Sequence, residues 1–512
     1  MIQKAETIKL KVRPVLLGIW HRYFYEGPCR FGKGEALEVG YDKLATEQAF
    51  KVFMDNVQNA CPEGVELMEP VRVWRTDEWE NTEEMWDALK DACTGADVCF
   101  LRTTIGIDDL DVEFAERFDV PMIINPESNF SPSSIHAAVK AKNIDREIYV
   151  PQDWTHVTKL FKALRAKKVI NSTRILLATR FNSDVSYSSC DTFSNHDLVT
   201  KNLGVHFRYV NVHELLDQMS PAVEGGNPTT PGRLTPDLTD EDMKEVEALA
   251  DEIIGHAESV DCERKYLINS LIAYVTVKKN LELKDCNAFT VPCPDVCSTR
   301  RLNEMQFTFC LTHSLNMENG IPSACEYDAD AALSQQALIA VSGKRPYMGN
   351  TTPIPYENGK LFPLFGLTPE IQDKLIKENP HNLYFMQHSV PNRHFVDNEK
   401  QGKYALKHFA YEQGFGAVLR YDFEQDKGQV ITICRFSPDG SKLVIGRGEI
   451  VTSAGYDLNN CNGMVIFRVK DAEDMWEKQI FAGNHMALVY GDYVEELKDL
   501  AKVLKIEALV SC

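Results

Sequence analysis

The 512-residue sequence contains no uncharged apolar run long enough for a membrane helix and no block of Lys or Arg. A spanning helix needs about 20 consecutive apolar residues, and nucleic-acid binding needs clustered basic side chains that neutralise phosphates. Here 75 acidic residues stand against 55 basic ones, which gives a formal net charge of −20. We therefore expect neither a membrane nor a nucleic acid as a partner.

The sequence also lacks the motifs of two large enzyme classes. No Gly-x-Gly-x-x-Gly follows the first predicted strand, and the nearest glycine-rich stretch, residues 445–448, lies at the end of a predicted hairpin. This disfavours a dinucleotide-binding enzyme. No Gly-x-Ser-x-Gly motif supplies a serine nucleophile either.

Cysteine is present, but its spacing does not indicate a disulfide framework. Most of the 14 cysteines stand singly, which is typical of free thiols in a reducing compartment. Cys293 and Cys297 are spaced C-x-x-x-C with no second pair or His nearby in the sequence, so we expect reduced buried thiols rather than zinc ligands. Because residues 1–14 contain no apolar signal-peptide core, we expect a cytoplasmic protein.

A chain of this length exceeds the roughly 250–300 residues of a single core, so several domains are expected. In residues 1–170, short apolar runs alternate with amphipathic stretches, as in βαβ units of a parallel sheet covered on both faces. Residues 171–350 continue this alternation, whereas residues 351–512 change to period two, with a hairpin signal at residues 437–440. The predicted fold is α/β, with two doubly wound parallel-sheet domains followed by a β-rich C-terminal domain.

The predicted central domain contains the helix and strand signals that matter most for function. Thr239 and Asp242 resemble a capping box that opens a helix, residues 298–316 are predicted to form one helix, and residues 330–342 a second that ends at Gly343. Residues 287–291 and 321–325 are predicted strands, and loops at the carboxyl ends of parallel strands are where open α/β sheets bind ligands.

Carboxylates stand at these strand ends. Glu304 lies near the start of the first helix, and Glu326 and Asp328 directly follow the second strand. Two converging carboxylates could bind a hard divalent cation such as Mn²⁺ or Mg²⁺, and an added imidazole favours Mn²⁺ or Co²⁺. His485, after Gly483, is the candidate imidazole. Taken singly, Glu304 is as well explained as a solvated helix residue, Asp328 as an N-cap and His485 as a loop histidine.

Two segments, residues 299–341 and 481–507, resemble the metal-site regions of the L-fucose isomerase and L-arabinose isomerase superfamily. In fucose isomerases a helical glutamate is followed about two dozen residues later by an aspartate that opens the next helix, and the third ligand is the histidine of an Asn-His pair. Glu304, Asp328 and Asn484-His485 match in type, order and approximate spacing. The predicted domain order is similar to that family as well.

The resemblance implies a metal-dependent aldose-ketose isomerase that acts on a pentose or a 6-deoxyhexose through a cis-enediol. Glu304, Asp328 and His485 would bind Mn²⁺, with Mg²⁺ and Co²⁺ as alternatives, and the two carboxylates would also be the acid/base pair. The chemistry is consistent, because a metal stabilises enediolate charge and two carboxylates near a cation can hold different protonation states. The resemblance further implies a homo-oligomer, a hexamer in related proteins, with a sugar as the partner.

Several polar residues are weaker candidates for substrate binding. His388 resembles a histidine near the metal of arabinose isomerases, and Arg22 resembles a fucose isomerase arginine that reaches the substrate of a neighbouring subunit. Asn303, Gln306 and Asn484 stand beside the proposed ligands and could bind hydroxyls or orient the ligands. A structural hydrogen bond, or for Arg22 a surface position, explains each of them equally well.

Two other functions remain open at this point. A metal-dependent sugar epimerase or lyase on the same scaffold would share every feature above, and product analysis would separate it from an isomerase. A non-catalytic sugar-binding protein would need neither three converging ligands nor a β-rich third domain.

Overall fold

The structure is a computed structural model that describes residues 1–24, 26, 32–76, 82–104, 107–127, 131–179, 192–219, 238–297, 300–354 and 368–512. The chain divides into two compact units. One is Ile8–Arg165, and the other joins Met1–Thr7 to Ala166–Cys512. The predicted central and C-terminal domains both lie in this larger unit, and the three-domain division stays a prediction.

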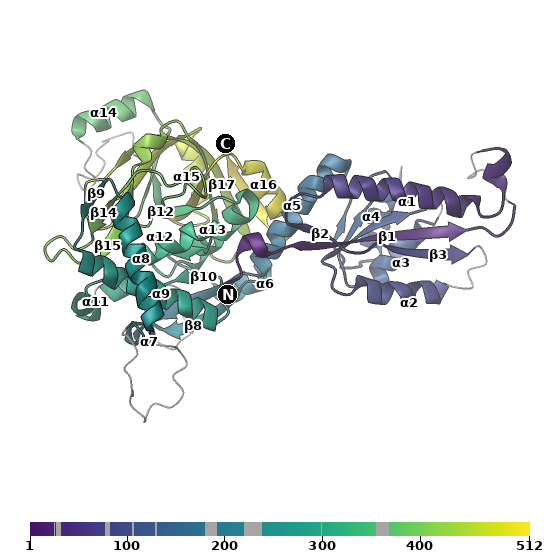
Figure 1. The fold of residues 1–512 in the computed structure, drawn as a ribbon. Helices are drawn as coiled ribbons and strands as arrows, with labels where there is room; N and C mark the ends of the chain where they lie inside the picture. Colours follow the sequence, from purple (N-terminus) through teal and green to yellow (C-terminus); the bar gives the residue numbers. More distant parts are fainter. Residues whose placement is uncertain are drawn as a thin grey trace. The chain divides into compact units, whose positions relative to one another are not determined.

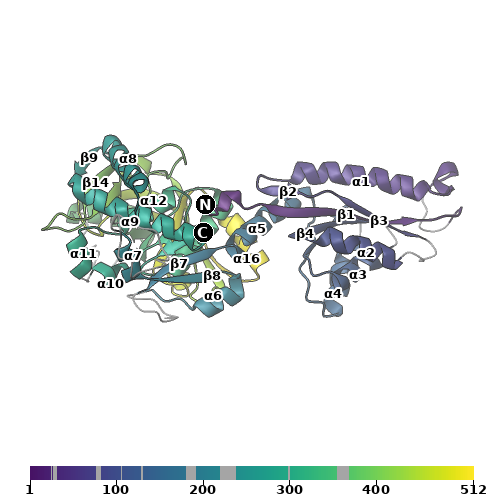
Figure 2. The same ribbon diagram turned by 60° about the horizontal axis from the view of Figure 1, so that its bottom comes forward.

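The smaller unit is a doubly wound α/β domain, as predicted. Its parallel strands are ordered β2-β1-β4-β5-β6, with β3 also paired to β1. Aromatic side chains of α1 and α5 pack on β4 at one face of this sheet, and α2, α3 and α4 cover the other face (Figures 1 and 2). The elements are β1 (Leu10–Trp20), η2 (Gly34–Leu37), α1 (Tyr41–Ala60), β2 (Val65–Leu67), β3 (Val71–Thr76), α2 (Thr82–Cys93), β4 (Val98–Thr103), α3 (Asp109–Arg117), β5 (Met122–Ile124), α4 (Ser131–Ala141), β6 (Ile148–Tyr149) and α5 (Trp154–Asn171).

The larger unit contains the second parallel sheet, of order β11-β10-β7-β8. The predicted capping box at Thr239 and Asp242 opens α8, and Gly343 ends α13 in the left-handed conformation, as predicted. The elements are η1 (Ala5–Thr7), β7 (Arg174–Thr179), α6 (His196–Leu203), β8 (His206–Asn211), α7 (Val212–Asp217), α8 (Asp240–His256), α9 (Arg264–Leu283), β10 (Ala288–Thr290), α10 (Cys293–Cys297), α11 (Arg300–Met305), α12 (Cys310–Glu318), β11 (Ser323–Ala324) and α13 (Ala329–Ser342).

The single helix predicted for residues 298–316 is wrong in one respect, because the chain forms two helices there. α11 ends at Met305, and α12 begins at Cys310. Gln306 between them has a φ of 55°, which a continuing helix cannot accommodate. Residues 298 and 299, at the start of the predicted helix, lie outside the described residues.

The β-rich C-terminal region is an antiparallel barrel. The strands run β16-β19-β12-β13-β18-β17, and β16 also pairs with β17, which closes the barrel, while β20 adds to β17 in parallel. β16 and β17 form the hairpin predicted at residues 437–440. The elements are β12 (Tyr347–Pro353), α14 (Pro369–Glu378), β13 (Leu383–Gln387), η4 (Phe423–Asp426), β16 (Val430–Phe436), β17 (Lys442–Ala454), β18 (Met464–Val469), α15 (Ala472–Gln479), β19 (His485–Tyr490), α16 (Val494–Leu504) and β20 (Glu507–Ser511), beside a small sheet of β9 (Ser259–Asp261), β14 (Tyr404–His408) and β15 (Ala417–Tyr421).

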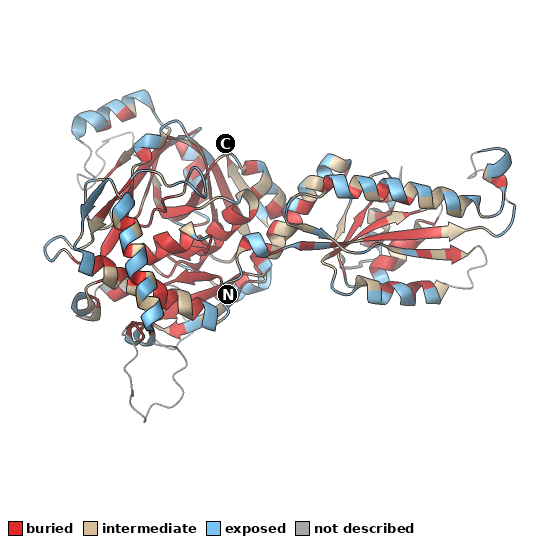
Figure 3. Ribbon diagram, viewed as in Figure 1, coloured by how far each residue is buried: buried red, intermediate tan, exposed pale blue. Residues whose placement is uncertain are grey.

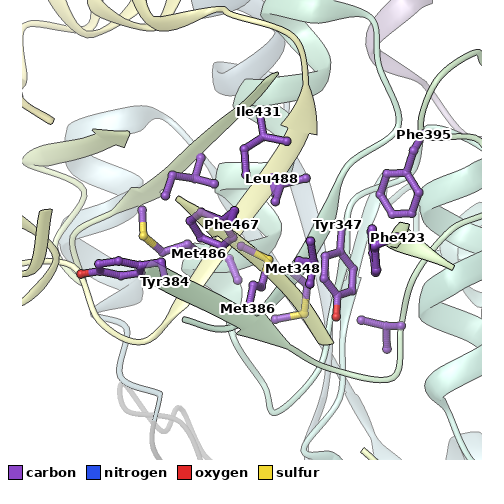
Figure 4. Close-up of a cluster of buried hydrophobic side chains, with 14 of the residues drawn as sticks. Tyr347, Met348, Tyr384, Met386, Phe395, Phe423, Ile431, Phe467, Met486 and Leu488 are labelled. Carbon is purple, nitrogen blue, oxygen red and sulfur yellow. The ribbon is translucent and has the colours of Figure 1, made fainter. Parts of the chain in front are cut away.

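Helix α13 joins the parallel sheet to the barrel. Residues 329–340 are all buried (Figure 3), which a helix tolerates only inside a large core. The helix contacts β10 and β11 of the parallel sheet and β16 and β19 of the barrel. Barrel side chains such as Tyr347, Met386 and Met486 form part of the core that packs against it (Figure 4). The N-terminus of α13 therefore lies between the two sheets. None of the described helices is long and apolar enough to cross a membrane.

A buried ion pair fixes the segment that follows β13. The Arg393 guanidinium donates to both carboxylate oxygens of Glu318, at 2.7 and 2.8 Å, and to Glu252 at 3.0 Å. The Arg393 side chain is only 4% exposed and that of Glu318 only 6%. Removing one partner of a buried ion pair leaves the other charge buried without a counter-ion.

We expect Arg393→Met to destabilise the larger unit by about 3–5 kcal/mol because Glu318 is left buried and unpaired. The melting temperature, measured by differential scanning fluorimetry, reports this loss. Arg264→Met is the matched control, since Arg264 is 42% exposed and pairs with Glu247 and Asp251 at the surface, where solvent screens an ion pair and its contribution to stability is small. Equal losses in the two variants would contradict the structural role of Arg393.

The smaller unit contains a carboxyl group with a perturbed pKa. Burial raises the pKa of Asp111 to about 8, opposed in part by the Thr103 hydroxyl, which donates to it at 2.8 Å. In an unfolded chain the group titrates at about 3.9. The folded state therefore binds the proton more tightly than the unfolded chain. Below about pH 4 the titration of Asp111 does not affect the stability of the fold, and as the pH rises from about 4 to about 8 it increasingly destabilises the folded state.

Asp111→Asn removes this ionisation. We expect the variant to melt at least about 4 °C above the wild type at pH 8, and the difference to be much smaller at pH 4.5 than at pH 8. Asp55→Asn, at an exposed position on α1, should show no such pH dependence. A difference between wild type and Asp111→Asn that stays constant with pH would contradict the assignment.

Candidate metal centre

The N-terminus of α13 brings together side chains that are far apart in the sequence. Glu326 and Asp328 lie between β11 and α13, His388 directly follows β13, and His485 is the first residue of β19. β12 pairs with both β13 and β19, and α13 packs on β19. The barrel therefore presents both imidazoles to the loop that opens α13.

Glu326, His388 and His485 form a group that could hold a metal ion. Their ligand atoms all lie within 4.8 Å of one another. Glu326 Oε1 is 3.4 Å from His388 Nε2, and Oε2 is 3.4 Å from His485 Nε2. Both imidazoles are buried, whereas the Glu326 side chain is 17% exposed. One carboxylate and two imidazoles are a common donor set for first-row divalent metals.

Asp328 orients His485. Its Oδ2 is 2.9 Å from His485 Nδ1, so a proton on Nδ1 is donated to the carboxylate and the Nε2 lone pair faces Glu326. Among the described residues, His485 Nε2 has no hydrogen-bond partner although it is buried. A carboxylate behind a histidine in this way is the usual support of a metal ligand.

Arg435 in turn holds Asp328. Its Nη1 donates to Asp328 Oδ2 at 2.7 Å, and its Nη2 donates to Oδ1 at 3.2 Å. The same guanidinium donates to the backbone oxygens of His485 and Ala482, at 2.6 and 2.7 Å. Burial alone would raise the pKa of Asp328, but the Arg435 charge and the His485 hydrogen bond outweigh it and hold that pKa well below its usual range. Asp328 is therefore a buried carboxylate anion.

His388 is held differently. The Ser389 amide donates to its Nδ1 at 3.2 Å, and its backbone is tied to the Tyr347 hydroxyl, which donates to the His388 oxygen at 2.8 Å. With Nδ1 as an acceptor, the neutral ring carries its proton on Nε2, towards Glu326. Glu326 and His485 thus fit a cation directly, whereas His388 would have to lose its Nε2 proton to become a third ligand.

The loop that carries Glu326 has a strained backbone. Glu326 and Tyr327 have φ values of 61° and 62°, a left-handed conformation that costs a non-glycine residue roughly 1–2 kcal/mol. The Thr192 hydroxyl donates to the Glu326 oxygen at 2.9 Å, and the Tyr327 amide donates to the Val291 oxygen at 2.9 Å. Strain held in place by the surrounding structure is typical of functional loops.

The structure brings three of the predicted site residues together, places Asn484 beside them and leaves the others elsewhere. Asp328, His388 and His485 meet at the centre. Asn484 is half-buried next to His485, where its amide donates to Asn350 Oδ1 at 2.8 Å. Glu304 and Asn303 are exposed on α11 and do not belong to the group, and Arg22 is exposed directly after β1 in the smaller unit. A ligand role for Glu304 and substrate contacts of Asn303 and Arg22 stay predictions.

Comparison with known proteins adds one finding. No family model matches the chain. Two proteins called sulfoquinovose isomerase, from Priestia aryabhattai and Priestia megaterium, are each 25% identical to it over 280 residues, which is 52% of this chain and 52% of the relative. The matched region therefore spans about half the length of these curated relatives.

The strain at Glu326 can be measured apart from any activity. We expect Glu326→Gly to be more stable than Glu326→Ala by about 1–2 kcal/mol, because both lack the carboxylate and only glycine relaxes at this φ. Melting temperatures in the presence of chelator compare the two variants without a contribution from bound metal. A Glu326→Ala variant as stable as the Glu326→Gly variant would show that the loop is not strained.

Proposed function

We propose that this protein is a divalent-metal-dependent isomerase that interconverts an aldose and a ketose through a cis-enediol. The observation that carries the proposal is the buried group of Glu326, His388 and His485, with Asp328 behind one of the imidazoles. The similarity to two sulfoquinovose isomerases, at 25% identity over half of each chain, supports the class of reaction.

Isomerisation moves one proton between C1 and C2 of the open-chain sugar and a second between their oxygens, and it needs stabilisation of the charge that develops on those oxygens. A bound divalent cation would supply that stabilisation and lower the pKa of the sugar hydroxyl. Glu326 and His485, joined by His388, would hold the cation. Mn²⁺ is proposed first because of the mixed carboxylate and imidazole donors, with Co²⁺ and Mg²⁺ as alternatives.

The proton carriers come from the same group of side chains. Glu326 reaches the solvent side of the centre, and His388 Nε2, which can carry a proton whenever it does not bind the cation, lies 3.4 Å from Glu326 Oε1. One group can accept a proton while its neighbour holds one, which is the condition for moving it between adjacent carbons. Asp328 is buried and paired with Arg435, so we propose it as the residue that orients His485, while Glu304 is kept as a candidate second proton carrier.

The substrate is proposed as a class. A pentose or a 6-deoxyhexose follows from the resemblance of residues 299–341 and 481–507, and the names of the two relatives add sulfoquinovose to the sugars worth testing. Arg22, Asn303 and Asn484 are the proposed substrate-binding residues outside the metal group. A homo-oligomer, a hexamer by the same resemblance, is proposed as the working assembly in the cytoplasm.

The test is turnover before and after restoring metal. Full-length protein is stripped with chelator, returned to Mn²⁺, Co²⁺ or Mg²⁺, and offered a panel of pentoses, 6-deoxyhexoses and sulfoquinovose, with products identified by NMR. We expect one sugar to give its ketose only after a metal is restored. Glu326→Gln should lower kcat by about 10²–10⁴-fold, and Asp328→Asn should weaken metal affinity by about 10–100-fold.

Glu495→Gln, an exposed substitution on α16, is the control and should leave turnover unchanged. A second stereoisomer in place of a ketose would identify an epimerase, and sugar binding without any product would identify a binding protein. Either result, or undiminished turnover by Glu326→Gln, would overturn the proposal.

A further inference from the structure

A second group of potential ligands lies close to the first in the chain but differs in chemistry. Cys293 in the first turn of α10, His313 in α12 and Cys325 directly after β11 bring their two sulfurs and one imidazole nitrogen within 4.8 Å of one another. His313 and Cys325 are buried, and Cys293 is half-buried. The sequence predicts reduced buried thiols rather than zinc ligands at Cys293 and Cys297. Cys293 and Cys325 are free thiols, and the nearby histidine was missed.

The His313 ring is held in a fixed orientation. Its Nδ1 is 2.8 Å from Ser323 Oγ, which also accepts from the Asn316 amide at 3.1 Å. The backbone of Ser323 is fixed at both ends by the Gln335 amide, at 2.6 and 3.1 Å. Hydrogen bonding of one ring nitrogen by a rigid neighbour is how proteins aim the other nitrogen at a metal.

The spacing of the ligand atoms suits a tetrahedral metal. His313 Nε2 is 3.6 Å from Cys293 Sγ. Tetrahedral zinc, with Zn–S of about 2.3 Å and Zn–N of about 2.0–2.1 Å, places such a sulfur and nitrogen about 3.6 Å apart. The three side chains therefore lie at a separation that one zinc ion would require of them.

The charge of such a centre suits its burial. Binding converts the two thiols to thiolates and releases two protons, so a divalent cation with two thiolates and a neutral imidazole has no net charge. An uncharged complex avoids the large cost of burying an unpaired ion. Sulfur donors also select against Mn²⁺ and Mg²⁺, which prefer oxygen.

We propose that Cys293, His313 and Cys325 bind one thiophilic divalent cation of the zinc class, separate from the carboxylate and imidazole centre at Glu326. The fourth ligand would enter from the side of half-buried Cys293 and would be a water molecule. Because Cys325 immediately precedes Glu326, this cation fixes the start of the strained loop that carries the Glu326 carboxylate.

The test uses cobalt as the probe and full-length, chelator-stripped protein. Thiolate bound to Co²⁺ gives an intense near-ultraviolet charge-transfer band, which the Glu326, His388 and His485 group cannot produce because it contains no sulfur. We expect the band to grow to one Co²⁺ per chain and to be lost on addition of Zn²⁺. Cys293→Ser and Cys325→Ser should each abolish or strongly weaken it.

Cys434→Ser is the matched control, since Cys434 is a buried free cysteine that belongs to neither group, and its band should equal that of the wild type. X-ray absorption of the zinc-loaded wild type needs no variant and should show sulfur neighbours at about 2.3 Å. Absence of the band and of sulfur neighbours, or a full band in both serine variants, would overturn the proposal and leave only thiol–imidazole hydrogen bonds. Neither readout depends on sugar turnover, so failure here is distinguishable from failure of the proposed isomerase.

Discussion

The pairing of Arg435 with Asp328 is the interaction on which the centre depends. Both side chains are only 1% exposed, and two charges removed from water are stable only when each is fully hydrogen-bonded. The guanidinium meets this condition through both Asp328 oxygens and the backbone oxygens of Ala482 and His485. One side chain of β16 thereby joins the N-terminus of α13 to the start of β19, and the position of the His485 ring follows from that junction.

Charge balance around Arg435 explains why a second acid in the first turn of α13 is tolerated. Asp330 is buried close to the same guanidinium, with Oδ2 at 3.9 Å from Nη2. Burial raises the pKa of Asp330 well above its usual value against the opposing Arg435 charge, and the neighbouring Asp328 charge also raises it. A neutral Asp330 that accepts from the Ser194 hydroxyl beside an ionised Asp328 leaves one negative charge against one positive charge. The helix N-terminus further favours the ionised member of the pair.

The sequence predicted those parts of the fold that local patterns determine. The alternation of apolar runs, the capping box at Thr239, the stop at Gly343 and the hairpin at residues 437–440 are all properties of a few neighbouring residues. The break at Gln306 was missed because a left-handed residue other than glycine has no sequence signature. Arg435 was missed for a related reason, since its partners come from α13 and β19 and only the folded chain brings them together.

The candidate site, like the fold, was predictable from the sequence only in part. Asp328 and His485 were selected through a family resemblance, and the structure places them side by side. Glu326 follows a predicted strand, but only its conformation makes it a ligand candidate. In a helix, residues two apart point about 200° away from each other, so Glu326 and Asp328 could not both face His485 there. The left-handed pair at residues 326 and 327 turns the chain from strand to helix so that Glu326 faces Nε2 and Asp328 faces Nδ1 of one imidazole. The strained conformation of this loop is therefore what places one carboxylate at each ring nitrogen of His485.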